Sequence, residues 1–535
     1  MQDVENIVNG QKLFLKPEYQ EVLKRKKEFE GNMGSVDPEK LEEISEWTKS
    51  WEYREKNFSR EAITVNPAKA CQPLGAIMAA LGFENTMPYV HGSHGCVAYF
   101  RGYFTRHFKE PTPCVSDSMS ESAAVFGGLA NMKDGLRNCS VMYKPEHIAV
   151  STTCMAEVIG DDLNAFVQGA VEDAEGDLDN TTITYAHTPS FVGSHITGYD
   201  NMMKAMLEQL NPSREEKVLD EERINIIPGF EPYLGSLAEI KEISKMFSDK
   251  IVMIGDHEEQ WNTGAGEYKL YAGGTTMEDA KTAINAKATI SLQKYSTVQT
   301  AKTIKNKWKQ GYETCNPIGL SGTDAFVMKL SELTGKEVPA ELAKQRAQLV
   351  DAMQDSYPYM HGKKFALYGD PDFLLGLVSF IVEMGGIPSH VLCHNAPKKG
   401  WEDDMKAIIS KSPWAEDCQI WVGKDLWHLR SLLFTEPVDF LIGNVYGKEL
   451  YRDTGTPLIR IGFPIFDRHH LHRYSISGYK GALNLLTWIT NAVLDQLDED
   501  TKEIGIAEYR VAKAPNDDDN FVDCLVDLYK KMEVE

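Results

Sequence analysis

The sequence has few cysteines for its length and no long apolar run. Nine cysteines in 535 residues are too few for a disulfide scaffold, and their odd number leaves at least one unpaired. No apolar stretch reaches the roughly 18 residues of a membrane span, and the first residues show no basic-then-apolar signal pattern. We therefore expect a cytoplasmic protein with no membrane association, in which clustered cysteines bind metal.

Motifs for phosphate and nucleophile chemistry are also missing. The sequence contains no GxxxxGK(S/T), GxGxxG or GxSxG segment, so nucleotide hydrolysis, dinucleotide binding and the hydrolase elbow have no support. If ATP is involved, we expect another chain to carry it. The net charge of −23 argues against nucleic-acid binding as the main function.

Apolar runs alternate in a pattern typical of an α/β protein. Residues 1–60 are charged and helix-prone with little apolar surface, which predicts an N-terminal helical arm that packs on something else. Strand-like runs such as Ile148–Ser151 then alternate with helical runs such as Asn201–Leu210, and 211–222 is predicted to be a linker. We predict three doubly wound parallel-sheet domains, the last with a C-terminal extension: 61–215, 216–345 and 346–535.

Three cysteines follow a strand-like run or open a helix. Cys96 and Cys154 come directly after strand-like runs, and Cys71 lies at a predicted helix start. Ligands of open α/β sheets bind outside the carboxyl ends of the strands, so we expect these thiols to converge in the domain 61–215. Clustered soft thiolates indicate an Fe–S or zinc site and favour electron transfer. Cys114 and Cys139 have weaker contexts and are interpreted as buried structural residues.

Other positions are ambiguous from spacing alone. Three thiolates do not complete an Fe–S site, for which four are usual, so a partner chain or an oxygen ligand must contribute. Ser190, at the next strand end, is a candidate, although its spacing alone favours an ordinary serine in a proline-containing turn. Asp351 and Asp355 are spaced i, i+4 and form either a hard-metal site or a solvated acidic face. Phe126, before two glycines, is either an exposed docking contact or a core residue.

Longer segments around these positions resemble the beta chains of nitrogenase molybdenum–iron proteins. The resemblance runs from about residue 40 to about residue 495. It implies Rossmann-like domains, an N-terminal arm that wraps the partner chain, and an α2β2 heterotetramer with a nitrogenase alpha chain. The segments that carry the resemblance are Thr64–Gly75, Met87–Phe100, Ser151–Asp162, His187–His195, Gly423–Arg430 and Ile461–Arg473.

The resemblance also implies a cofactor and a role. An 8Fe-7S P-cluster would be shared with the alpha chain, with Cys96 bridging its halves and Cys71 and Cys154 each holding one iron. Ser190 would be the oxygen ligand of the oxidised cluster. Electrons would come from a transiently bound, ATP-hydrolysing Fe protein homodimer. They would pass to the iron–molybdenum cofactor, held only by the alpha chain, where dinitrogen is reduced to ammonia.

The same resemblance assigns the remaining candidates. Phe126 matches the region where the Fe protein docks. Glu110, the carbonyl of Lys109, Asp351 and Asp355 match a divalent-cation site, for Fe or Ca, between two beta chains. No residue of this chain is expected to be catalytic in dinitrogen reduction.

Two homologous families provide alternative functions. One is the nitrogenase cofactor-assembly scaffold, and the other is a protochlorophyllide-reductase-type subunit. Members of the scaffold family typically lack the complete set of three cysteines and a serine that is present here. The sequence departs from the family at His94, where glutamine is more usual, and 172–180 and 256–267 match nothing familiar.

Overall fold

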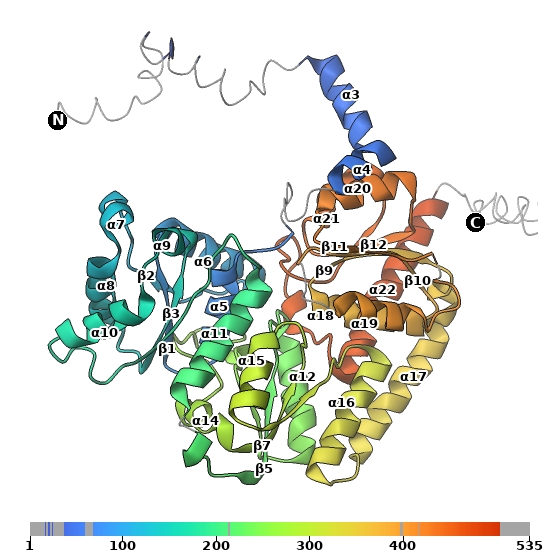
Figure 1. Cartoon of the computed structure of the whole chain (residues 1–535). Helices are drawn as coiled ribbons and strands as arrows, with labels where there is room; N and C mark the ends of the chain where they lie inside the picture. Colours follow the sequence, from blue (N-terminus) through green and yellow to red (C-terminus); the bar gives the residue numbers. More distant parts are fainter. Residues whose placement is uncertain are drawn as a thin grey trace, which may run out of the picture. The chain divides into compact units, whose positions relative to one another are not determined.

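The computed structural model describes residues 37–58, 68–211, 214–395, 400–415 and 417–502, and the isolated positions 17, 20, 21 and 24. It contains three β-sheets whose strands are connected by helices (Figure 1). Every strand pairing within the three sheets is parallel. The predicted α/β class with parallel sheets is therefore confirmed. The chain divides into two units, 1–66 with 425–437 and 67–424 with 438–535, and all three sheets belong to the second.

The first sheet has four strands in the order β2-β1-β3-β4. Neighbouring residues of its strands face two different cores, because Val90 and Ala149 belong to one cluster while Tyr89 and Val150 belong to another. A strand buried on both faces requires this alternation of apolar side chains. The elements in chain order are α5 (Gln72–Leu81), β1 (Thr86–His91), α6 (His94–Phe108), β2 (Val115–Ser116), α7 (Glu121–Phe126), α8 (Leu129–Tyr143), β3 (His147–Thr152), α9 (Cys154–Ile159), α10 (Leu163–Asp173), β4 (Thr182–Ala186) and α11 (His195–Leu210).

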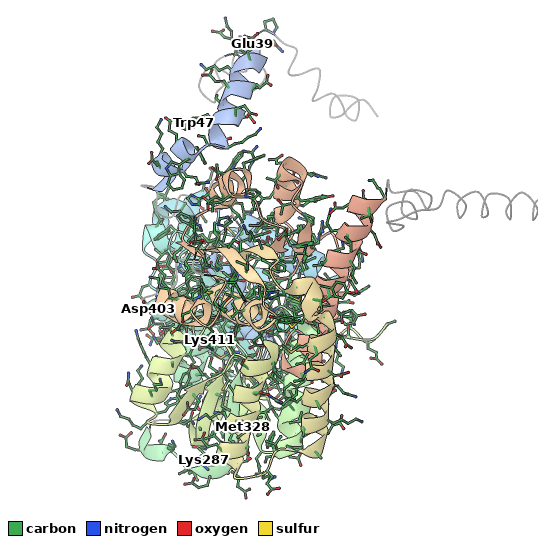
Figure 2. The ribbon with its side chains drawn as sticks, turned by 90° about the vertical axis from the view of Figure 1, so that its right-hand side faces the viewer. Glu39, Trp47, Lys287, Met328, Asp403 and Lys411 are labelled. Atoms are coloured by element: carbon green, nitrogen blue, oxygen red, sulfur yellow. The ribbon has the colours of Figure 1, made fainter. Side chains whose placement is uncertain are left out.

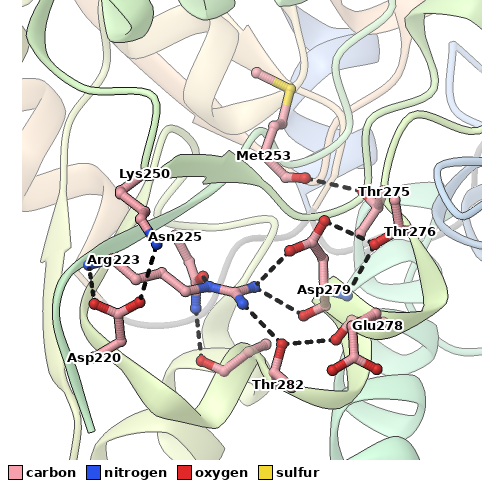
Figure 3. A network of polar contacts seen from close by, with 12 residues as sticks. Asp220, Arg223, Asn225, Lys250, Met253, Thr275, Thr276, Glu278, Asp279 and Thr282 are labelled. Atoms are coloured by element: carbon pink, nitrogen blue, oxygen red, sulfur yellow. Dashed lines mark hydrogen bonds and ion pairs between the residues drawn. The ribbon is translucent and has the colours of Figure 1, made fainter.

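The second sheet has the order β6-β5-β7-β8. A buried guanidinium, that of Arg223 on β5, connects this inner strand to α14 (Figure 3). Arg223 donates to the Thr282 hydroxyl at 2.8 Å and to the Asp279 carbonyl at 2.9 Å. Because a buried charge needs paired and hydrogen-bonded partners, these bonds fix the C-terminal part of α14 on the strand. The elements are β5 (Asp220–Ile227), α12 (Leu234–Phe247), β6 (Ile251–Met253), α13 (Glu258–Trp261), α14 (Met277–Lys281), β7 (Ala286–Ser291), α15 (Val298–Lys302) and β8 (Gly311–Thr314).

The third sheet has five strands in the order β11-β10-β9-β12-β13. Its core is continuous with that of the second sheet, since Ile224 and Ile226 of β5 belong to the same buried cluster as Leu367 of β9 and Val391 of β10. The elements are α16 (Gly319–Thr334), α17 (Ala340–Met360), β9 (Lys364–Gly369), α18 (Pro371–Glu383), β10 (Ile387–Cys393), α19 (Trp401–Ile409), β11 (Gln419–Val422), α20 (Leu426–Thr435), β12 (Phe440–Gly443), α21 (Gly447–Thr454), β13 (Leu458–Arg460) and α22 (Gly478–Thr501).

The helices that cover the sheets are amphipathic. On α19, Trp401, Met405 and Ile409 are buried at a spacing of four residues, while Asp403 is exposed. On α16, Met328 lies on the outer face and is 60% exposed (Figure 2). Within the described residues, none of the helices combines the length and apolar character needed to cross a bilayer.

The smaller unit contains α3 (Pro38–Thr48) and α4 (Trp51–Phe58), which pack with α20. The Arg54 side chain is 1% exposed and forms an ion pair with Glu436 at 3.4 Å. The Ser431 hydroxyl donates to the carbonyl of Ser50 at 2.9 Å. The described part of the predicted arm is therefore helical and is attached to a helix of its own chain. Most of the arm before residue 37 lies outside the described residues.

Candidate functional site

The three predicted cysteines lie at helix starts around the carboxyl ends of the strands of the first sheet. Cys71 is the N-cap of α5, Cys96 is the third residue of α6 after β1, and Cys154 is the first residue of α9 after β3. Because β1 and β3 are parallel neighbours, the loops that follow them leave the same edge of the sheet. In the first turns of α5 and α6, the N–H groups of Leu74 and Cys96 donate to the carbonyls of Cys71 and Ser93, at 3.3 and 3.1 Å.

The three thiols influence one another electrostatically. Burial raises the pKa of Cys71, and the nearby Cys154 raises it further. Burial also raises the pKa of Cys96, with added contributions from Cys154 and Cys71. Cys154 is exposed, whereas Cys71 and Cys96 are half-buried against one apolar cluster. The fold therefore brings the three thiols into one neighbourhood, as predicted.

Ser190 belongs to the same neighbourhood. A hydrogen bond between its side chain and Cys71 lowers the pKa of the thiol, against the larger effect of burial. The turn that carries Ser190 is held by Gln72, whose amide donates to the carbonyls of Pro189 at 2.9 Å and Val192 at 2.6 Å. The residue next to one thiol thus positions the serine.

The other cysteines in the described residues are different in character. Cys114 and Cys139 are 5% and 3% exposed, and burial raises the pKa of each thiol to about 12. All eight cysteines in the described part of the chain are free. The interpretation of Cys114 and Cys139 as structural residues agrees with their burial.

The candidate cation ligands are not gathered within one chain. Glu110 follows α6 and pairs with Arg473 at 3.4 Å, and Lys109 is the left-handed C-cap of α6. Asp351 and Asp355 are exposed on α17. Among the described residues, no group of three or more His, Cys, Asp or Glu side chains is arranged to hold a single metal ion. Glu110, Asp351 and Asp355 therefore do not form a cation site by themselves.

Phe126 is an exposed aromatic. It is the last residue of α7, it is 88% exposed, and Gly127 follows with φ +88°. Val125 and Val158 are each 74% exposed, so Phe126 is one of several large apolar side chains on α7 and α9. The alternative of a buried core residue is therefore wrong.

Several polar residues at the site had no recognisable signal in the sequence. His195, the first residue of α11, accepts the Ala70 N–H at Nδ1 over 3.2 Å. His91 lies between the carboxylates of Asp117 and Asp161. These partners are separated by 125, 26 and 70 positions, so no local spacing could have predicted them.

Comparisons with known proteins agree with this geometry. A family model described as nitrogenase component 1 type oxidoreductase matches residues 71–494, and a model of a domain of unknown function (DUF3364) matches residues 1–57. The nitrogenase molybdenum–iron protein beta chain of Rippkaea orientalis is 56% identical over 501 residues, which are 94% of this chain and 97% of that protein. The chain belongs to this family of beta chains. The beta chain of Azotobacter vinelandii is 51% identical over 520 residues, 95% of this chain and 98% of that protein.

A solved structure supports the same assignment. Nitrogenase Cp1 at pH 6.5 superposes with a TM-score of 0.78 at 40% identity, covering 82% of this chain and 95% of that chain. The present chain is therefore a subunit of a nitrogenase, an oxidoreductase, as the sequence predicted. Membership of this family implies metal–sulfur clusters and a complex with an alpha chain.

Proposed function

We propose that this chain is the half of dinitrogenase that holds the P-cluster together with an alpha chain. The observation that carries the proposal is the convergence of Cys71, Cys96 and Cys154 at one edge of the first sheet, with Ser190 bonded to Cys71. The donor set fits a polynuclear iron–sulfur group, because thiolates are soft ligands and the three do not form a chelating group for a single ion. When bound, the 8Fe-7S cluster would supply electron transfer towards the iron–molybdenum cofactor of the alpha chain.

The residues of this chain have distinct proposed roles. Cys96 would bridge the two halves of the cluster, while Cys71 and Cys154 would each hold one iron. Ser190 would approach as an alkoxide ligand after oxidation, because a hard oxygen donor suits a more ferric iron. In that role its hydroxyl would lose the proton that now permits the hydrogen bond with Cys71.

Two surfaces would complete the assembly. Phe126, together with the exposed Val125, would contact the transient Fe protein homodimer, which hydrolyses ATP. Glu110, the Lys109 carbonyl, Asp351 and Asp355 would bind Fe or Ca between the beta chains of an α2β2 tetramer. The cation would share the Glu110 carboxylate with Arg473, which pairs with one of its oxygens at 3.4 Å, or would displace that side chain. Asp351→Asn with Asp355→Asn should lower the content of this cation and leave the cluster iron unchanged.

Iron and acid-labile sulfide per αβ pair test the main proposal. The measurement is made on co-purified protein from which the iron–molybdenum cofactor has been withheld. Eight irons with seven sulfides are expected for the P-cluster. A single four-iron cubane would instead support the assembly scaffold or the protochlorophyllide-reductase relative.

A further inference from the structure

Three loops of the first sheet meet on one buried imidazole. His91 is the last residue of β1, and its Nδ1 atom hydrogen-bonds to the Asp117 carboxylate. Its Nε2 atom lies 2.9 Å from Oδ2 of Asp161. The side chains of His91 and Asp117 are 0% exposed and that of Asp161 is 4% exposed. The three groups therefore interact in the absence of bulk water.

His91 donates from both ring nitrogens, and is therefore an imidazolium, when both carboxyl groups are ionised. A carboxylate oxygen only accepts hydrogen bonds, so a lone pair on either nitrogen would face a negative oxygen. Burial disfavours the charged ring, but the hydrogen bonds and charges of Asp117 and Asp161 outweigh it and raise the pKa of His91. The imidazolium thus separates two carboxylates that would otherwise repel each other.

Each carboxylate also holds a backbone amide. Asp117 accepts the Gly92 N–H at 2.9 Å, and Gly92 begins the short connection to α6, the helix that carries Cys96. Asp161 accepts the Gly128 N–H at 3.2 Å, two residues after Phe126. Both distances are ordinary hydrogen-bond lengths, so a shift of either carboxylate would lengthen or break its bond to the glycine N–H.

The third connection leads to the helix of Cys154. Asp161 lies two residues after the end of α9, the helix that begins at Cys154. The carbonyl of His91 accepts the N–H of Thr153, the residue before Cys154, at 3.0 Å. Gly92 leaves no room for a change here, because a Cβ atom on it would meet the Thr153 hydroxyl at 2.0 Å. Both ends of α9 are therefore connected to His91, through Thr153 before its start and through Asp161 after its end.

We propose that His91 is a positioning residue that couples the exposed segment around Phe126 to the helix starts that carry Cys96 and Cys154. The inference rests on the proposed function in what it says about the cluster, but the coupling of the loops stands independently. Removing the cation would leave two buried carboxylates facing each other, and their repulsion would move the Gly92 and Gly128 amides that they hold. A displacement of the segment around Phe126 would be transmitted towards Cys96 and Cys154 through the same hydrogen bonds of Asp161, His91 and Asp117.

The test compares His91→Gln with His147→Gln in the assembled protein. His147 is a matched control, because it is also fully buried in the first sheet but bonds to the hydroxyls of Thr86 and Thr184 at the start of β3. Hydrogen exchange should become about tenfold or more faster at Gly92 and Gly128 in His91→Gln. It should stay unchanged at both glycines in His147→Gln. Redox titration of the cluster should show a shifted midpoint only in His91→Gln, at equal iron content.

Variants of the individual carboxylates distinguish the Asp117–Gly92 bond from the Asp161–Gly128 bond. Asp161→Asn should accelerate exchange at Gly128 more than at Gly92, and Asp117→Asn should do the reverse. If His91→Gln does not assemble, these two variants carry the test. Equal exchange at both glycines in all variants and wild type would overturn the proposal, as would an equal response in His147→Gln.

The outcomes also separate this inference from the proposed function. If wild-type protein lacks the eight-iron cluster, but exchange at Gly92 and Gly128 is still faster in His91→Gln than in wild type, the cluster assignment is refuted and the coupling is retained. A full cluster with an unchanged exchange pattern and midpoint in His91→Gln would retain the function and refute the coupling.

Discussion

Gly75 of α5 and Gly198 of α11 let the two helices meet backbone to backbone. A Cβ atom at Gly75 would lie 1.7 Å from the carbonyl oxygen of His195, and one at Gly198 would lie 1.8 Å from that of Gln72. Real Cβ atoms do not approach so closely, so any larger residue must push the helices apart. Since Cys71 caps α5, this contact sets the distance between the thiol and the serine turn that precedes α11.

The first prediction concerns this contact. Gly198→Ala should lower the free energy of unfolding by about 1–3 kcal/mol through overpacking and should perturb the cluster spectrum. Gly102→Ala on α6 is the control, because nothing lies within 4 Å of a Cβ there. It should stabilise the helix by about 0.5–1 kcal/mol. Denaturant unfolding of the two variants checks the opposite signs, and equal effects would contradict the packing argument.

Cys96→Ala should prevent stable α2β2 assembly. Under the proposed function, the cluster would lose the thiolate assigned to join its halves at the subunit interface. Iron content per αβ pair and gel filtration measure the outcome. Cys139→Ala removes a thiol that is 3% exposed on the other side of the sheet, and it should assemble with full iron. Full iron in Cys96→Ala would show that the bridging assignment is wrong.

Ser190→Ala should leave the reduced cluster intact and change the oxidised one. The hydroxyl bonded to Cys71 would no longer be available as an oxygen ligand. Ser93→Ala offers a comparison, because Ser93 also hydrogen-bonds to a candidate ligand, Cys96. Electron paramagnetic resonance of the oxidised states should change strongly only in Ser190→Ala. Identical oxidised spectra in wild type and Ser190→Ala would leave Ser190 as an ordinary turn residue.

The buried Glu231 should make stability depend on pH. Burial raises the pKa of its carboxyl from 4.5 to about 8, so the folded state binds the proton more tightly than the unfolded state. The contribution of this preferential proton binding to the free energy of unfolding is fully present below pH 4.5 and is lost as the pH rises through about 8. Glu231→Gln should flatten the fall of the thermal midpoint over this range, and the exposed Glu259→Gln should not. A parallel pH profile for Glu231→Gln and wild type would contradict the prediction.

Thiol labelling should follow exposure in the cluster-free isolated chain. Cys154 is exposed, Cys71 and Cys96 are half-buried with raised pKa values, and Cys114 and Cys139 are buried with pKa values of about 12. Alkylation reports the thiolate that is accessible to the reagent. Mass spectrometry at pH 7.5 should find modification first at Cys154 and last at the buried pair. Early labelling of Cys139 would mean that the first sheet is not folded as described.

Alternating runs of apolar residues were sufficient to predict the elements that bury both faces. The strand predicted at Ile148–Ser151 is β3, His147–Thr152, and the parallel order followed from the intervening helices. The helix predicted from Asn201 begins six residues earlier, at His195, because Ser194 and Thr197 form a capping box there. The predicted linker 211–222 is wrong at its end, since β5 already starts at Asp220. Exposed acidic residues at the start of that strand concealed its beginning.

The candidate site was predictable only where a possible ligand residue directly follows a strand. Cys96 and Cys154 follow β1 and β3 directly, so their convergence follows from the parallel pairing. The partners of His91 come from loops far apart in the sequence, and only the folded sheet brings them together. Gln72 shows no pattern either, although its amide fixes the turn of Ser190.

The continuous core under the second and third sheets has a consequence for how the chain comes apart. Ile224 and Leu367 belong to one buried cluster, although the predicted domain boundary near residue 345 lies between them in the sequence. Cutting the chain there would expose a large apolar surface on both fragments, and neither would be expected to fold alone. The second and third sheets should therefore unfold in a single cooperative transition. The protein would then have fewer independently folding units than it has sheets.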